Sequence, residues 1–111
     1  MSDVQEQIAE IIKNNDVLVF MKGTPKMPQC GFSQRVCAIL QEQSVPFAAI
    51  NVLLDPAVRE GIKEFSDWPT IPQLYVKGEF VGGCDIISEM HEDGELTTLL
   101  APLKEADSKA A

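Results

Sequence analysis

The chain has 111 residues, with 17 acidic and 9 basic side chains, and its formal net charge is −8. This length fits one domain that buries about two-thirds of its unfolded surface. The negative charge disfavours nucleic acid and anionic membranes as partners, and no apolar run approaches the roughly 18 residues of a membrane span. An odd number of cysteines, three, argues against a secreted disulfide framework and favours a reducing compartment.

The first third of the chain predicts a helix, a strand and a second helix. Ser2 and Gln5 resemble a capping box, and apolar residues then recur at helical spacing up to Asn14. Residues 17–21 form an unbroken apolar run, which is typical of a strand buried on both faces. A loop with two prolines separates this strand from a helix predicted over about residues 30–43.

The remainder of the chain predicts three more strands and three more helices. Residues 47–52 indicate a strand, and Asp55 followed by proline is a strong helix start. Residues 74–76 and 80–81 flank a short loop with glycine, which predicts a hairpin. Apolar residues mark the last two helices, at Ile86, Ile87 and Met90 and at Leu96, Leu99, Leu100 and Leu103.

This order of elements predicts an α/β domain with a four-stranded mixed sheet between helices. The first two strands are joined by a helix, so we expect them to lie parallel with a right-handed crossover. The last two strands form an antiparallel hairpin. We expect residues 1–104 to form the domain and residues 105–111 to be a frayed polar tail.

A single cysteine is the best candidate for chemistry. Cys30 opens the run Cys-Gly-Phe-Ser, and Ser33 stands where a second cysteine would complete a redox pair. Its sulfur must therefore work with a thiol or a metal from outside the chain. Cys30 lies at a predicted helix start, with Lys22 and Lys26 nearby, so we expect a lowered pKa for its thiol. A buried, inert cysteine is the alternative.

The other two cysteines carry weaker signals. Cys37 lies two helical turns from Cys30, about 10 Å away by helical rise and too far for a disulfide without rearrangement, so a place in the core is favoured. Cys84 follows two glycines at a predicted helix start. It can serve packing, a backbone contact or a disulfide with Cys30, and the sequence leaves these open.

Four segments resemble the monothiol, CGFS-type glutaredoxins of the thioredoxin superfamily. They are 22–25 (Lys-Gly-Thr-Pro), 30–33 (Cys-Gly-Phe-Ser), 68–73 (Trp-Pro-Thr-Ile-Pro-Gln) and 82–85 (Gly-Gly-Cys-Asp), and they agree in order and spacing with the short single-domain members over residues 5–103. The resemblance implies a thioredoxin-like fold and a cis bond before Pro72. Cys37 is not part of this motif set, so redox behaviour here can differ from that of relatives.

The resemblance also implies a 2Fe–2S cluster that bridges two subunits, with glutathione completing its ligands. A 2Fe–2S cluster takes four ligands, usually thiolates. One chain offers one well-placed thiolate, Cys30, as metal ligand and catalytic group. A symmetric homodimer offers two, and two glutathione thiols make four.

Glutathione carries two carboxylates and one ammonium group. Family members hold its carboxylates with cations that match Lys22, Arg59 and Lys63. Arg59 and Lys63 share one helical face. Ordinary solvated surface charge is an alternative explanation for this spacing. Backbone N–H groups near Asp85 are suited to bind the second carboxylate. The Asp85 side chain can bind the ammonium group, cap the helix, or do both. The resemblance also implies that Ile71 contacts the cysteine moiety of glutathione through its main chain. The predicted glutathione-binding residues are Lys22, Arg59, Lys63, Ile71, Gly83, Cys84 and Asp85.

Three functions follow from this resemblance. The first is an iron–sulfur carrier that passes its cluster to acceptor apoproteins. The second is a glutathione-dependent oxidoreductase that removes glutathione from protein thiols through Cys30, with at most weak activity. The third is a regulatory module that pairs with a BolA-like protein. The N-terminus lacks a signal or transit pattern, so we expect the cytoplasm, or the mitochondrial matrix if this is a processed form.

Overall fold

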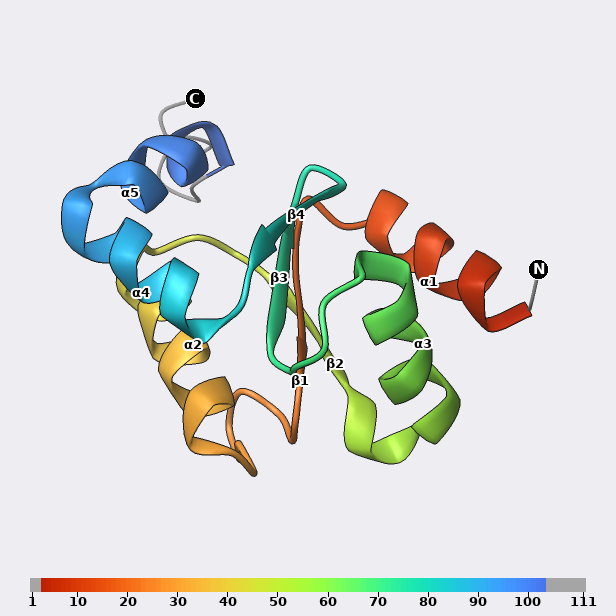
Figure 1. The fold of residues 1–111 in the computed structure, drawn as a ribbon. Coiled ribbons are helices and arrows are strands. Elements are labelled where there is room, and N and C mark those ends of the chain that lie inside the picture. Colours follow the sequence, from red (N-terminus) through yellow and green to blue (C-terminus); the bar gives the residue numbers. More distant parts are fainter. Residues whose placement is uncertain (1–2, 104–111) are drawn as a thin grey trace.

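The structure, a computed structural model, describes residues 3–103 and shows a four-stranded sheet between two layers of helices (Figure 1). None of the described helices is long and apolar enough to cross a membrane. In chain order the elements are α1 (Asp3–Lys13), β1 (Val17–Met21), α2 (Gly31–Glu42), β2 (Ala48–Asn51), the 3₁₀ turn η1 (Val52–Leu54), α3 (Pro56–Ser66), β3 (Gln73–Val76), β4 (Glu79–Gly82), α4 (Cys84–Asp93), α5 (Glu95–Leu100) and the 3₁₀ turn η2 (Ala101–Leu103).

The sheet has the strand order β2-β1-β3-β4, which confirms the predicted mixed topology. β1 pairs in parallel with β2 and antiparallel with β3, and β3 and β4 form the predicted hairpin. Lys77 and Gly78 make its tight turn with φ values of 53° and 84°. Positive φ at both turn positions matches the right-handed twist of the flanking strands.

Each face of the sheet has its own apolar core. α1 and α3 cover one face, and α2, α4 and α5 cover the other (Figure 1). Along β1, Leu18 and Phe20 point into the first core, whereas Val17, Val19 and Met21 point into the second. Both faces are buried, and this explains why β1 is an unbroken apolar run rather than an alternating one.

The helices that flank the sheet begin where sequence predicts, with one correction. The Asp55 carboxylate accepts the Val58 N–H at 3.3 Å and caps α3, with Pro56 in the first helical position. For α4, however, the cap is Gly83 and Asp85 lies inside the first turn, so the N-cap role considered for Asp85 is wrong. The helix begins early because Gly82, with φ of 153°, turns the chain directly out of β4.

Two element ends also differ from prediction. The strand expected over residues 47–52 is Ala48–Asn51, because the Asn51 side chain accepts the Leu53 N–H at 3.0 Å and starts η1. The last helix ends at Leu100, and the chain continues as a 3₁₀ turn. The Ser2 cap, the end of the domain at residue 104 and the tail at 105–111 lie outside the described residues.

The Asn51 side chain should matter for stability because it joins two segments. It also accepts the N–H of buried Gly23 at 2.9 Å, so Asn51→Ala leaves two donors without their acceptor. We expect the free energy of unfolding to fall by about 1–3 kcal/mol, measured by urea denaturation. Asn51→Asp keeps an acceptor oxygen and is the matched control. Equal unfolding midpoints for wild type and Asn51→Ala would contradict this role.

Candidate functional site

A pocket of about 470 Å³ lies at the edge of the sheet where β1 ends. It brings together six of the predicted residues from four separate segments of the chain. Gly83 and Cys84 stand next to Asp85 but do not line it. Phe32, Pro69 and Thr70 line it as well, although sequence reasoning did not select them as site residues. The full lining is Lys22, Cys30, Phe32, Arg59, Lys63, Pro69, Thr70, Ile71 and Asp85.

Cys30 occupies the N-cap of α2, with an extended backbone (φ −151°, ψ 134°), and its carbonyl accepts the Gln34 N–H at 2.9 Å. Partial burial raises the pKa of its thiol. Three hydrogen bonds to the sulfur lower this pKa, from the backbone of Ser33, the backbone of Phe32 and the Ser33 hydroxyl, and the charge of Lys22 lowers it as well. Together these effects outweigh the effect of burial, so the pKa of the thiol is lowered. The lowered pKa of this thiol at the pocket wall agrees with the prediction from sequence.

Ser33 also has a structural task. It is fully buried, and its Oγ accepts the backbone N–H of Lys22 at 3.0 Å. The hydroxyl hydrogen remains available for the Cys30 sulfur, in keeping with the contribution of this hydroxyl to the lowered pKa. One side chain thus joins the end of β1 to the start of α2 and supports the thiolate between them.

The loop between β1 and Cys30 is held by its own backbone. Thr24 and Met27 exchange N–H···O bonds of 3.2 and 3.0 Å, and the Gln29 N–H donates to the Lys22 carbonyl at 2.9 Å. Gly23 has φ of 92°, and a Cβ there would lie 2.5 Å from the Met27 carbonyl oxygen, so only glycine fits. The loop delivers Cys30 to the pocket in one defined conformation.

α3 supplies two cations to the opposite wall. Arg59 and Lys63 both line the pocket, which confirms that they share a face. Lys63 also lies 3.6 Å from Glu60, so their mutual repulsion is partly offset within the helix. Among the described residues, the buried Nε of Arg59 has no hydrogen-bond partner. A buried donor of this kind calls for an acceptor from outside the chain.

The segment before β3 completes the pocket. The Ile71–Pro72 bond is cis, which confirms the expectation from the resemblance. Buried Gln73 holds this segment, since its amide donates to the carbonyls of Trp68 and Thr70, each at 3.1 Å. Sequence reasoning missed this role of Gln73, although it closes the motif that contains the proline. Trp68 packs beside Phe80, with ring centroids 5.5 Å apart.

The remaining cysteines stand apart from this chemistry, and all three cysteines are free thiols. Cys37 is buried in the core with its sulfur 3.4 Å from the sulfur of Met21, and burial raises the pKa of its thiol. Its predicted place in the core is confirmed. Cys84 is half-buried and packs against the core under α4. Of the alternatives left open for Cys84, the structure shows packing.

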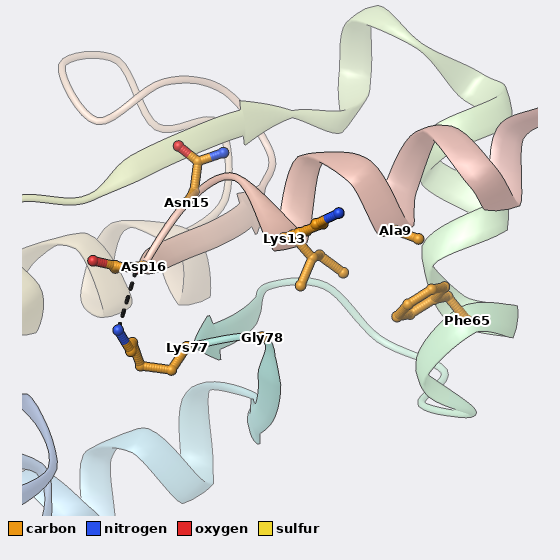
Figure 2. Close-up of a pocket in the computed structure, with 8 residues that line it drawn as sticks. Ala9, Lys13, Asn15, Asp16, Phe65, Lys77 and Gly78 are labelled. Carbon is orange, nitrogen blue, oxygen red and sulfur yellow. Dashed lines mark ion pairs between the residues drawn. The ribbon is translucent and has the colours of Figure 1, made fainter.

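A second pocket, of about 410 Å³, lies at the other end of β1 (Figure 2). It is lined by Ala9, Ile12, Lys13, Asn15, Asp16, Phe65, Lys77 and Gly78. Lys77 reaches toward Asp16, 3.7 Å away, and Phe65 lies beneath Ala9 on the far side (Figure 2). The lining holds no cysteine or histidine, so the Cys30 pocket is the better candidate for chemistry.

A cysteine at a helix start that shares a pocket with the residue before a cis-proline, at the edge of a four-stranded mixed sheet, defines a thioredoxin-like protein. The glutaredoxin family model matches residues 17–81. A monothiol glutaredoxin of Rickettsia typhi is 57% identical over 93 residues, which cover 84% of each chain. Monothiol glutaredoxin-4 of Schizosaccharomyces pombe is 52% identical over 99 residues, and the match spans 89% of this chain but only 41% of that protein.

Solved structures show the same similarity to monothiol glutaredoxins. A monomeric truncated mutant of Trypanosoma brucei 1-C-Grx1 is 42% identical, with a TM-score of 0.81, and the match covers 92% of this chain and 93% of that one. The chain therefore belongs to the glutaredoxin family, and within it to the monothiol glutaredoxins. Glutathione use is a property of this family.

The hydrogen bonds to Cys30 predict how its reactivity depends on pH. In a Cys37→Ala/Cys84→Ala background, the rate of alkylation by iodoacetamide should titrate with a midpoint below that of an ordinary cysteine thiol. Ser33→Ala should move this midpoint to higher pH, because a donor to the thiolate is lost. Ser66→Ala, a substitution elsewhere, is the control. A midpoint that does not move in Ser33→Ala would contradict the assignment.

Proposed function

We propose that this protein is a carrier that binds a glutathione-ligated 2Fe–2S cluster in a homodimer and transfers it to acceptor apoproteins. The single observation that carries this proposal is that Cys30 is the only cysteine lining the pocket. Within residues 3–103, no three His, Cys, Asp or Glu side chains lie close enough to hold a metal ion. A four-ligand cluster must therefore take ligands from other molecules.

The chemistry of the donor set fits this cargo. Each of two chains would contribute the Cys30 sulfur, whose pKa is lowered and which is the one cysteine sulfur in the lining of its pocket. Two glutathione thiols supply the other two ligands. A serine at position 33 suits this task, because a second thiol there would compete with iron for Cys30.

The pocket also fits glutathione. Its carboxylates would pair with Lys22, Arg59 and Lys63, and the unpartnered Nε of Arg59 would gain an acceptor. Asp85 would accept from the glutathione ammonium. The main chain of Ile71 would hold the cysteine moiety, and the backbone N–H groups of Gly83 and Cys84 would bind the second carboxylate.

Transfer would be an exchange of ligands without a net change of redox state. Each iron–sulfur bond to Cys30 or glutathione that breaks would be replaced by a bond from iron to an acceptor thiolate. Protons lost by the acceptor thiols would pass to the released thiolates or to solvent. The iron and sulfide atoms would move together to the acceptor.

Anaerobic reconstitution with iron, sulfide and glutathione tests the carrier function. We expect a coloured dimer with the visible absorption of a 2Fe–2S cluster. Cys30→Ser should lose the cluster entirely, since it removes the one ligand that each chain supplies, whereas Cys84→Ser should keep it. A colourless, monomeric wild type, or a Cys30→Ser variant that still holds the cluster, would reject the proposal.

The role of Arg59 is tested by the glutathione concentration needed for half-maximal cluster formation. Loss of charge-assisted hydrogen bonds to a carboxylate, worth about 1.5–3 kcal/mol, should raise this concentration about 10- to 100-fold in Arg59→Gln. Arg35, whose Nε donates to the Ser88 hydroxyl at 3.1 Å, lies outside the pocket lining, so Arg35→Gln is the control. Equal requirements in both variants would contradict this role of Arg59.

The lowered pKa of Cys30 favours a second candidate function, a weak glutathione-dependent oxidoreductase. The Cys30 thiolate would attack the glutathione sulfur of a mixed disulfide and release the protein thiolate. Glutathione would then attack the Cys30–glutathione disulfide and leave as glutathione disulfide. Turnover in a coupled glutathione assay would favour this function. Pairing with a BolA-like protein stays a proposal from the resemblance. A cytoplasmic location, or the mitochondrial matrix for a processed form, stays a proposal from the N-terminal sequence.

A further inference from the structure

Two buried polar side chains of β3 lie behind the wall of the Cys30 pocket. Gln73 is fully buried and Tyr75 is 2% exposed, and neither of them lines the pocket. A polar group in the core is costly unless its hydrogen bonds are made there. Neither ligation of a cluster nor contact with glutathione uses these two side chains, so their position in the core needs another explanation.

The Gln73 amide has partners on both sides, which fixes its orientation. Its Nε2 donates to the carbonyls of Trp68 and Thr70, each at 3.1 Å. Its Oε1 accepts the Tyr75 hydroxyl at 3.3 Å. An amide nitrogen carries two hydrogens and no acceptor, so only one orientation of this group serves two carbonyls and a hydroxyl donor.

The Tyr75 hydroxyl is held in one place and keeps its proton. Its ring contacts Phe20, Phe65 and Phe80, with ring centroids 5.7, 6.3 and 5.4 Å apart. Burial raises the pKa of the Tyr75 phenol to about 12, although a hydrogen bond with the Ser66 hydroxyl lowers it. The phenol therefore remains a donor to Gln73 at neutral pH.

The bonds from Gln73 determine which way the Thr70–Ile71 peptide faces. Among the described residues only the Ile71–Pro72 bond is cis, so the Thr70–Ile71 peptide is trans. The C=O and N–H groups of a trans peptide point in opposite directions. Because the Thr70 carbonyl points toward the buried Gln73 amide, the Ile71 N–H points away from it. No backbone carbonyl in residues 3–103 accepts this N–H, which leaves it available to a bound molecule.

We infer that Gln73, oriented by Tyr75, is a positioning residue for glutathione, which turns the Ile71 N–H toward the cysteine moiety in the Cys30 pocket. This inference rests on the glutathione site of the proposed function and adds two residues that touch no ligand. A donor that is already oriented lowers the ordering cost of binding. Loss of the Gln73 donors would free the Thr70–Ile71 peptide to rotate, and binding would weaken although every residue in contact with glutathione is retained.

The test measures the dissociation constant of glutathione for the apo protein by NMR titration, in which the Ile71 amide signal is followed. Gln73→Met keeps an unbranched side chain of similar length and removes both donors, so we expect the dissociation constant to rise about 5- to 10-fold. Gln43→Met is the matched control. Gln43 is also a buried glutamine, and its Nε2 makes hydrogen bonds with His91 and Thr97, each at 3.0 Å, outside the pocket. This control should lose stability but bind glutathione as wild type does.

Tyr75→Phe is a second variant, which keeps the test decisive if Gln73→Met does not fold. It removes only the hydroxyl that orients the Gln73 amide, so we expect the dissociation constant to rise about 2-fold and the signals of the Gln73 side-chain amide to shift. An unchanged dissociation constant in the folded variants would overturn the inference.

Two further results would also overturn it. One is a loss of affinity in Gln43→Met equal to that in Gln73→Met, which would show a general effect of stability. The other is a wild-type Ile71 amide signal that does not respond to glutathione. Failure of the carrier function is seen separately: an apo protein that binds glutathione with the expected order of affinities, but forms no cluster with iron and sulfide, would reject the carrier function and support the positioning role.

Discussion

The rest of the site depends on how a single sulfur is held at the start of α2. Cys30 caps this helix, receives hydrogen bonds from the backbone of Phe32 and Ser33, and lies close enough to Lys22 to benefit from its charge. The Ser33 hydroxyl supports the thiolate while its oxygen accepts the Lys22 N–H. Serine at this position therefore does more than leave out a second thiol. It joins the strand, the loop and the helix around a sulfur that has no internal partner.

The fold explains why distant segments meet at this sulfur. β1 is the parallel partner of β2 and the antiparallel partner of β3, so its end lies beside the turn into α3 and the segment that enters β3. α3 contributes Arg59, and the segment before β3 contributes Ile71 and its cis bond to Pro72. The buried amide of Gln73 fixes that segment. Separate parts of the chain thus meet around one sulfur, and α3 supplies the cations Arg59 and Lys63 to the wall opposite it.

Local signals predicted the fold well, and long-range polar contacts explain what they missed. The apolar run at 17–21 predicts a strand buried on both faces, and Asp55 before a proline predicts a capped helix; both depend only on neighbouring residues. Asn51 shortens its strand because its side chain binds backbone groups in two places, one of them 28 residues away. Asp85 lies in the first turn of α4 rather than at its N-cap because a glycine, and not a carboxylate, begins this helix. The roles of Asn51 and Gln73 depend on partners that the fold brings near, so neither was predicted.

The central claim is that the Cys30 thiolate takes its co-ligands from glutathione and from a second chain. Native mass spectrometry of anaerobically reconstituted protein tests it most directly, because it counts every component of one assembly. The account predicts a species with two chains, two glutathione molecules, two iron atoms and two sulfides, which Cys30→Ser cannot form. A cluster held by one chain alone, or a protein that binds glutathione but never iron and sulfide, would contradict it.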